Sequence, residues 1–207
     1  MDTHDLLTMT QWLSPAFPLG SFAYSHGLET EIAEGRVTNS GELEDWLRFI
    51  VTRGTGATDA ILLCQALAGC DVAPHARALH ASRERAEEAE AQGAAFAATL
   101  RGMGYDQRDA PLPVAVGEAA RALSLAPQTV AALYLHAFAS NLVSCAVRFV
   151  PLGQAQGQSV LAAIKADINR TAKQAAEAEL ADIRSAAFLA DVAAMAHETL
   201  QPRVFRT

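Results

Sequence analysis

The chain has few cysteines, and their positions exclude a scaffold held by disulfides or zinc. Cys64, Cys70 and Cys145 are odd in number, widely separated and set in apolar segments. A disulfide framework needs paired cysteines, and a structural zinc site needs closely spaced thiol or imidazole ligands. We therefore expect all of them to be buried core thiols.

Aromatic residues and runs of β-branched residues are also scarce. Aromatics make up 6% of the 207 residues, whereas hydrophobic residues reach 51%, with alanine prominent, and charged residues 19%. This composition favours closely packed helices over sheet, and it does not shift along the chain in a way that marks a second domain. The predicted fold is all-α, a single domain over residues 1–207 in which about seven to nine helices form a bundle around a buried central helix.

Two further signals are missing, one for nucleic-acid binding and one for secretion. The formal net charge is −7, and binding to nucleic acid needs a basic face that neutralises phosphates, so nucleic acid is not an expected partner. The N-terminus, M-D-T-H-D, is acidic and lacks the basic start and the apolar run of a secretory signal. We expect a cytoplasmic protein whose partners are other proteins.

No motif for catalysis or for metal binding is present. His197 and Glu198 resemble the start of a helical zinc motif, but Gln201 stands where the second histidine is required. His75 and His80 are five residues apart and do not share a helix face, so we expect surface residues rather than metal ligands. The sequence also has no G-x-S-x-G turn and no Gly-rich phosphate loop. The expected protein is not an enzyme and binds no cofactor stably.

The densest pattern that is present is the segment Ser14–Glu29, S-P-A-F-P-L-G-S-F-A-Y-S-H-G-L-E. Pro15 and Pro18 exclude a continuous helix there. Ser21 is placed to cap a new helix from about Phe22 to Gly35. Several bulky residues must pack on the body of the protein or on a partner, so a packed turn and an interaction surface fit equally well. These residues are Phe17, Leu19, Phe22 and Tyr24.

Helical periodicity continues through the rest of the chain. In the first half of the chain the sequence predicts a short helix before Pro15, an amphipathic helix capped by Asn39 or Ser40, a further helix up to Gly69, and a mostly exposed helix from Pro74 to about Leu100. In the second half it predicts a short helix near Val114 to Leu123 and a helix that carries Leu161, Ile164 and Ile168. A last helix carries Phe188, Leu189, Val192 and Met195.

The predicted central helix lies between Thr129 and Val147, where the sequence has no Asp, Glu, Lys or Arg. Its length alone would permit a membrane span, but polar residues such as His136 and Asn141 would be costly in hydrocarbon and suit a buried bundle helix instead. Membrane insertion is therefore not expected. A polar stripe, Asn141, Ser144, Cys145 and Arg148, follows one side of this helix. Its members either form internal hydrogen bonds or, in the case of Arg148, face another protein.

The end of the chain, H-E-T-L-Q-P-R-V-F-R-T, predicts an extended tail from about residue 201. A frayed terminus is the usual fate of such residues. Arginine and phenylalanine, however, are residue types enriched at protein interfaces, and the tail carries Arg203, Phe205 and Arg206. A partner-binding tail is the alternative.

Three separated stretches together resemble the UreF family of urease accessory proteins. They are the Ser14–Glu29 segment, the stretch N-L-V-S-C-A-V-R-F-V-P-L-G-Q and the tail. The segment R-E-R-A-E-E-A-E-A-Q-G-A-A-F is also similar to the middle helix of the family, so the resemblance covers essentially the whole chain. The motifs occur in the family's order and at suitable spacing.

The resemblance implies a non-catalytic, all-helical homodimer that joins a UreD- or UreH-type accessory protein and a UreG-type GTPase to apo-urease. Such a complex inserts nickel into apo-urease at the expense of GTP. The resemblance thus implies that the partners handle nickel and GTP and that this chain modulates the GTPase. The resemblance assigns partner binding to Phe17, Pro18, Tyr24, Glu29, Arg148, Arg203, Phe205 and Arg206. Two departures stand out: Arg148 replaces a lysine of some relatives, and Phe188 replaces a proline of many.

The two rival interpretations are a nickel-binding metallochaperone and a small hydrolase. A metal carrier is expected to show clustered histidine or cysteine, and a hydrolase needs a nucleophile with its base. The sequence shows neither pattern, so we favour the scaffold.

Overall fold

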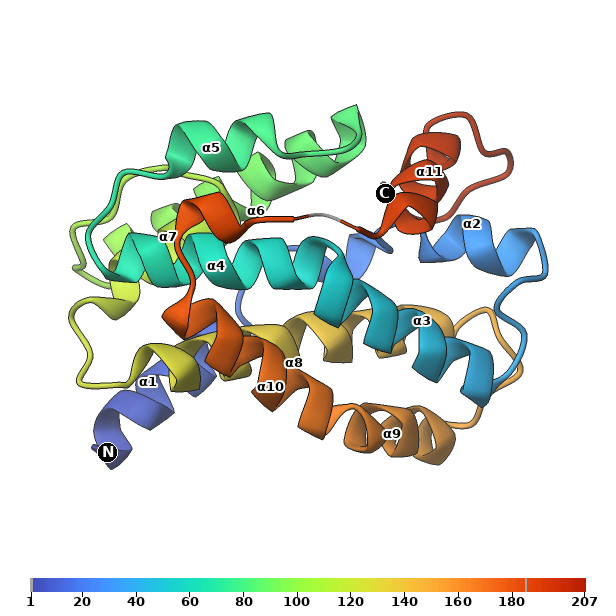
Figure 1. Cartoon of the computed structure of the whole chain (residues 1–207), viewed down its shortest axis with the longest axis horizontal. Helices are drawn as coiled ribbons and strands as arrows, with labels where there is room; N and C mark the ends of the chain where they lie inside the picture. Colours follow the sequence, from blue (N-terminus) through green and yellow to red (C-terminus); the bar gives the residue numbers. More distant parts are fainter. Residues whose placement is uncertain (1, 185) are drawn as a thin grey trace.

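The computed structural model describes residues 2–184 and 186–207, and the regular elements of this part of the chain are all helices (Figure 1). The α-helices are α1 (Thr3–Trp12), α2 (Leu28–Ala33), α3 (Ser40–Arg53), α4 (Thr55–Leu67), α5 (Ala73–Ala78), α6 (Arg83–Gly102), α7 (Leu112–Ala120), α8 (Pro127–Ala146), α9 (Gln154–Ala163), α10 (Lys165–Glu177) and α11 (Phe188–His197). Two short 3-10 helices, η1 (Ser21–Ala23) and η2 (Leu180–Asp182), complete the set. The all-α prediction is confirmed.

The helices are more numerous and shorter than predicted, because the chain turns where the apolar pattern continues. The single helix expected around Leu161 to Ile168 is divided into α9 and α10 at Ile164, although no glycine or proline stands there. The long helix expected from Pro74 is likewise divided into α5 and α6, and Ser82 caps α6 by accepting a hydrogen bond from the Arg85 amide at 3.2 Å. All of these helices contribute to one hydrophobic core.

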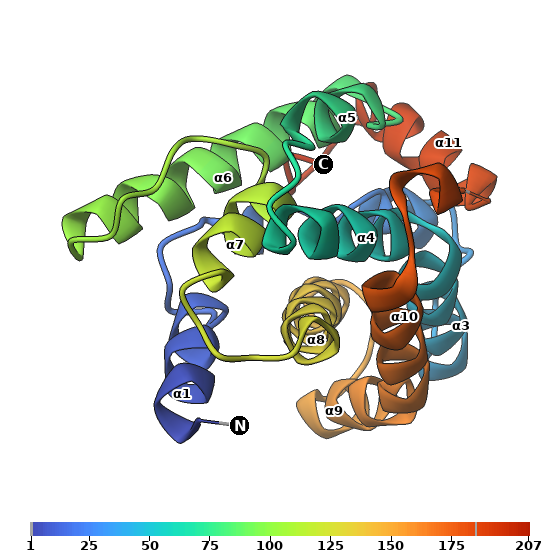
Figure 2. The same ribbon diagram turned by 60° about the vertical axis from the view of Figure 1, so that its left-hand side comes forward.

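Helix α8 is the central helix, as predicted, and it begins at Pro127. It packs against α10, α4, α9 and α3, and Figure 2 shows it end on among them. By length and composition it could cross a membrane, and half of its apolar window is buried inside the protein. The other half forms what we call the open face of α8, which carries Leu133, His136, Ala137, Ser140 and Ser144.

Helix α3 forms where its cap and its apolar spacing predict it. The Asn39 side chain accepts hydrogen bonds from the amides of Gly41 and Glu42, at 3.0 and 3.1 Å, and so satisfies two free donors of the first turn. The buried side chains follow at helical spacing. They are Leu43, Trp46, Leu47, Ile50 and Val51.

The helix predicted from Phe22 to Gly35 is wrong, because the chain forms η1, then an extended stretch, and then α2. His26 and Gly27 separate these elements with positive φ angles of 56° and 80°. Gly27 is required there for a second reason as well. A Cβ atom at this position would lie 2.8 Å from the backbone nitrogen of Ala194 in α11. The break in the helix is therefore set by packing against a segment far along the chain.

The prediction that the alanine- and charge-rich segment is mostly exposed is also wrong. One face of α6 is buried and carries Glu84, Arg85, Glu88, Gln92 and Phe96. These charged groups tolerate burial because they pair with one another and with groups from other elements. Cys64 and Cys145 are buried as expected, whereas Cys70 is exposed.

Candidate partner-binding surface

The tail from residue 201 contains no helix, and it is packed on the body of the protein. The Phe205 side chain is only 3% exposed. The Arg206 amide donates to the Ala23 carbonyl at 2.7 Å, and the Ser25 amide donates to the Thr207 carbonyl at 2.7 Å. The Ser25 hydroxyl also donates to the Thr207 carbonyl. Two of the stretches that carried the family resemblance, the Ser14–Glu29 segment and the tail, thus lie side by side.

The polar stripe of α8 contacts the backbone of the Ser14–Glu29 segment. The Asn141 side chain donates to the carbonyls of Ser21 and Tyr24, at 2.8 and 3.3 Å. The Cys145 thiol lies 3.4 Å from the Tyr24 carbonyl. Internal hydrogen bonding, one of the two alternatives for the stripe, therefore applies to both side chains.

Arg148 is the exposed end of the same stripe and touches both neighbouring segments. Its guanidinium donates to the Phe22 carbonyl at 3.3 Å and lies 6.0 Å from the centre of the Phe205 ring. Phe149 also contacts that ring, with the two ring centroids 5.2 Å apart. Exposed contacts of this kind contribute little to stability, so most of the guanidinium is available to a partner.

Behind the tail lies a buried network of charged groups around His197. The ring nitrogens of His197 lie 2.9 Å from Glu29 Oε2 and 2.8 Å from Glu84 Oε2. Glu29 also accepts the amides of Val204 and Phe205, at 2.7 and 2.9 Å, and Glu84 pairs with Arg203. Residues of α2, α6, α11 and the tail therefore meet at one point.

A second buried network joins the same helix α6 to the core. Arg85 pairs with Glu88, and His26 Nε2 lies 2.9 Å from Glu88 Oε1. Burial lowers the pKa of His26, and the charge of Arg85 lowers it further. Burial alone would raise the pKa of Glu88, but the attraction of Arg85, followed by that of His26, outweighs it and lowers this pKa to about 2. The same His26 Nε2 also lies 3.2 Å from the Arg85 guanidinium, so this ring nitrogen faces both members of the Arg85–Glu88 pair.

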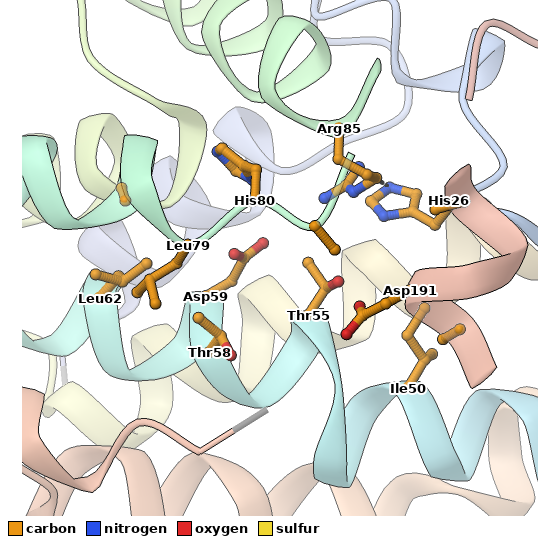
Figure 3. Close-up of a pocket in the computed structure, with 14 residues that line it drawn as sticks. His26, Ile50, Thr55, Thr58, Asp59, Leu62, Leu79, His80, Arg85 and Asp191 are labelled. Atoms are coloured by element: carbon orange, nitrogen blue, oxygen red, sulfur yellow. Dashed lines mark hydrogen bonds between the residues drawn. The ribbon is translucent and has the colours of Figure 1, made fainter. Parts of the chain in front are cut away.

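The Arg85 network borders a small cavity of about 40 Å³ between α4, α11 and the start of α6 (Figure 3). Asp59 lies on its wall and accepts a hydrogen bond from the Tyr134 hydroxyl at 2.9 Å. Burial raises the pKa of Asp59 to about 6 and lowers that of His80, on the same wall, to about 4. In Figure 3 the guanidinium of Arg85 lies between the rings of His80 and His26.

This cavity is not a metal centre. In the part of the chain that the structure describes, no group of three His, Cys, Asp or Glu side chains converges in a way that could hold a metal ion. The Arg85 cation beside the histidines would also repel a metal cation. A volume of about 40 Å³ suits a few water molecules instead.

The outer face of α11 carries bulky apolar side chains that are exposed. Phe188 and Leu189 are 74% and 69% exposed, and Val192 and Met195 follow on the same face. The face turned towards the body carries small residues, mainly alanines, together with His197. An amphipathic helix normally buries its bulky side and exposes its small or polar side, so α11 is inverted. Bulky apolar side chains presented in this way mark a docking surface.

A groove of about 410 Å³ runs along the open face of α8. From α8 its lining includes the small residues Ala137, Ser140 and Ser144 as well as larger ones. The charged Asp59, Arg85 and Glu88 also line it. Its wall comes from the end of α1 and the turn at Pro15, and the largely exposed Phe22 contributes to its lining.

The residues assigned to partner binding divide between the surface and the interior. Pro18, Arg148, Arg203 and Arg206 are exposed. Phe17, Tyr24, Glu29 and Phe205 are buried within the chain, so they support the surface from inside.

Sequence reasoning missed the outer face of α11 and the groups around His197. The first carried a signal, because the bulky and the small residues of Phe188–His197 separate onto opposite faces. The second carried a weaker signal, in that Glu84, Arg85 and Glu88 share one side of a helix.

The chain is similar to known proteins over nearly its whole length. Residues 37–165 match the model of the UreF family. The urease accessory protein UreF of Cereibacter sphaeroides strain KD131 is 54% identical over 206 residues, covering 98% of each chain. That of Jannaschia sp. is 51% identical over 210 residues, covering 99% of this chain and 96% of the relative. That of Rhizobium etli is 40% identical over 214 residues, covering 98% and 96%.

Proposed function

This chain belongs to the UreF family of urease accessory proteins, and on that basis we propose that it is a non-catalytic scaffold for urease maturation. In this proposal it links a UreD- or UreH-type accessory protein and a UreG-type GTPase to apo-urease in the cytoplasm. Nickel and GTP are handled by the partner complex, and this chain holds no cofactor of its own. It modulates the GTPase through the assembly.

The observation that carries the proposal is the inverted helix α11 beside the tail. Its outer face presents bulky apolar side chains, and the tail presents the exposed Val204 together with the exposed cations Arg203 and Arg206. A central apolar area with arginine at its rim has the composition of a protein interface. We assign this surface to the UreD-type protein. The exposed guanidinium of Arg148, at the far side of Phe205, is assigned to control of the GTPase.

A Leu189→Asp variant tests the assignment of α11. Leu189 is exposed, so the change leaves the core intact, but a charge placed in the centre of an apolar contact should weaken binding of the UreD-type protein by about tenfold or more. The measurement is a titration of the purified partner. Leu7→Asp on α1 is the matched control, because Leu7 is 64% exposed but lies on another helix. Equal affinity of the wild type and the Leu189 variant would refute the assignment.

The homodimer is assigned to the open face of α8. Each chain carries a net charge of −7, so two copies repel over most of their surfaces, and the charge-free helix Pro127–Ala146 offers the approach with the least repulsion. Small residues on the open face of α8 allow a helix of the second copy to come close. Helix α8 is about 30 Å long, which suits an extended contact. A Ser140→Glu variant should sediment as a monomer. A dimer that persists unchanged would place the second copy elsewhere.

A further inference from the structure

His197 lies between two carboxylates, and a doubly protonated ring would donate to both of them. It is fully buried, and each ring nitrogen faces a carboxylate oxygen, of Glu29 at 2.9 Å and of Glu84 at 2.8 Å. Carboxylates only accept hydrogen bonds, and a neutral imidazole has a single N–H to donate. Both carboxylates also accept hydrogen bonds from the tail. The geometry therefore fits an imidazolium.

The same two carboxylates hold the tail in place. Glu29 accepts the amides of Val204 and Phe205, and Glu84 pairs with Arg203. Two negative groups thus face two positive ones, the imidazolium and the guanidinium. This balance matters because an unmatched buried charge is strongly destabilising.

We propose that His197, in its doubly protonated form, is a positioning residue that fixes the tail and couples it to the outer face of α11 as one binding surface. The proposal rests on the proposed function, in which that surface binds the UreD-type protein. Without the imidazolium, two carboxylates would share one cation and one of them would lose its donor, so the tail would loosen. The charged groups that face the ring are Glu29 of α2 and Glu84 of α6. Arg203 of the tail pairs with Glu84, and Arg83 pairs with Glu198, the residue after His197.

The first test is a His197→Gln variant of the full chain without partners. Glutamine is neutral and cannot supply a donor to each of two carboxylates, so the amides of Val204 and Phe205 should exchange with deuterium about tenfold faster or more. His75→Gln is the control, because His75 is an exposed histidine on α5. Unchanged protection of both amides in the His197 variant would overturn the proposal.

A second variant separates charge from packing. Adding Glu84→Gln to His197→Gln removes one carboxylate together with the imidazolium, so the remaining groups are again balanced. The double variant should therefore recover part of the amide protection that the single His197 variant loses. Losses that simply add would indicate independent packing roles and would refute the coupling.

The wild-type protein provides a test that does not depend on the folding of a variant. Nitrogen NMR of the labelled ring should show both nitrogens of His197 protonated at neutral pH. A ring with a single proton at neutral pH would contradict the proposal. Binding of the UreD-type protein is measured in parallel. If the wild type does not bind it, the proposed function fails, while the NMR and exchange results still decide the role of His197.

Discussion

Asp59 illustrates at the residue scale how burial changes the chemistry of one group. Its carboxyl group is buried beside Arg85 and accepts a hydrogen bond from Tyr134, and burial raises its pKa to about 6. The folded protein therefore binds this proton more tightly than the unfolded chain does. Stability from this group is complete below about pH 4 and is lost as pH rises through about 6, where the buried carboxyl ionises.

An Asp59→Asn variant should accordingly be more stable than the wild type at pH 7.5, by about 2–3 kcal/mol. Asparagine keeps an acceptor for the Tyr134 hydroxyl and never ionises, so the advantage should shrink to almost nothing near pH 4. Urea denaturation at both values of pH measures the difference. Asp106→Asn, in an exposed loop, is the control and should change little at either pH. A gain that does not depend on pH, or a loss at pH 7.5, would show that Asp59 is not the titrating group.

Residues whose partners are distant in the chain were the hardest to place from the sequence. Glu84, Arg85 and Glu88 form a charged run of the kind that usually lies on a solvated helix face. They are buried because His197, Arg203 and His26 come from other elements to neutralise them, and no local pattern reveals such partners. The exposed Arg148 was easier to place, because it ends a helix stripe whose spacing can be counted.

At the scale of elements, prediction succeeded where a local signal sets the boundary. Helix α3 begins at an asparagine cap, and α8 begins at Pro127, and both signals are read directly from the chain. The break between η1 and α2 could not be predicted in this way. It depends on the approach of α11 to Gly27, which is a contact between the two ends of the chain.

The tail behaves as a packed element, and this changes what its removal should do. Deleting residues 203–207 takes away the buried Phe205 ring and leaves Glu29 without two of its donors. We expect a folded protein that is less stable by ~2 kcal/mol or more, which is a fall of about 4–8 °C in melting temperature. Binding of the UreD-type protein should be lost as well.

Arg206→Ala is the control for this truncation, because the Arg206 side chain is exposed and only its backbone amide bonds to the body. Its melting temperature should match that of the wild type. A truncated protein with an unchanged melting temperature would mean that the tail is not packed in solution.

At the scale of the whole molecule, the sequence supported the fold class, the central helix and the family. It could not reveal that α11 turns its bulky side outward or that α8 keeps an open face, because periodicity does not say which side of a helix meets the body. In both cases the exposed side is the surface we assign to a partner. Apolar patterning alone cannot separate an intramolecular core from a core that forms on assembly.

We expect the isolated protein to bind neither nickel nor GTP tightly. Burial raises the pKa of Cys64 to about 11 and that of Cys145 to about 12, so neither thiol is a ready thiolate ligand at neutral pH. The described residues also offer no converging set of three metal ligands. Calorimetry with nickel and with GTP, after removal of any purification tag, should show no site with a sub-micromolar dissociation constant. A nickel site of that strength would favour the metallochaperone instead.

The contact between Glu29 and the tail also bears on how the protein is made. The carboxylate emerges from the ribosome 175 residues before the Val204 amide that it accepts. At roughly 5–20 residues per second, translation leaves Glu29 without this contact for on the order of ten seconds or longer. Throughout that interval the Glu29 carboxylate has no donor from the tail, and the contact can form only after Val204 and Phe205 have been made. A substitution among residues 203–207 can therefore act on α2, a helix made early in synthesis.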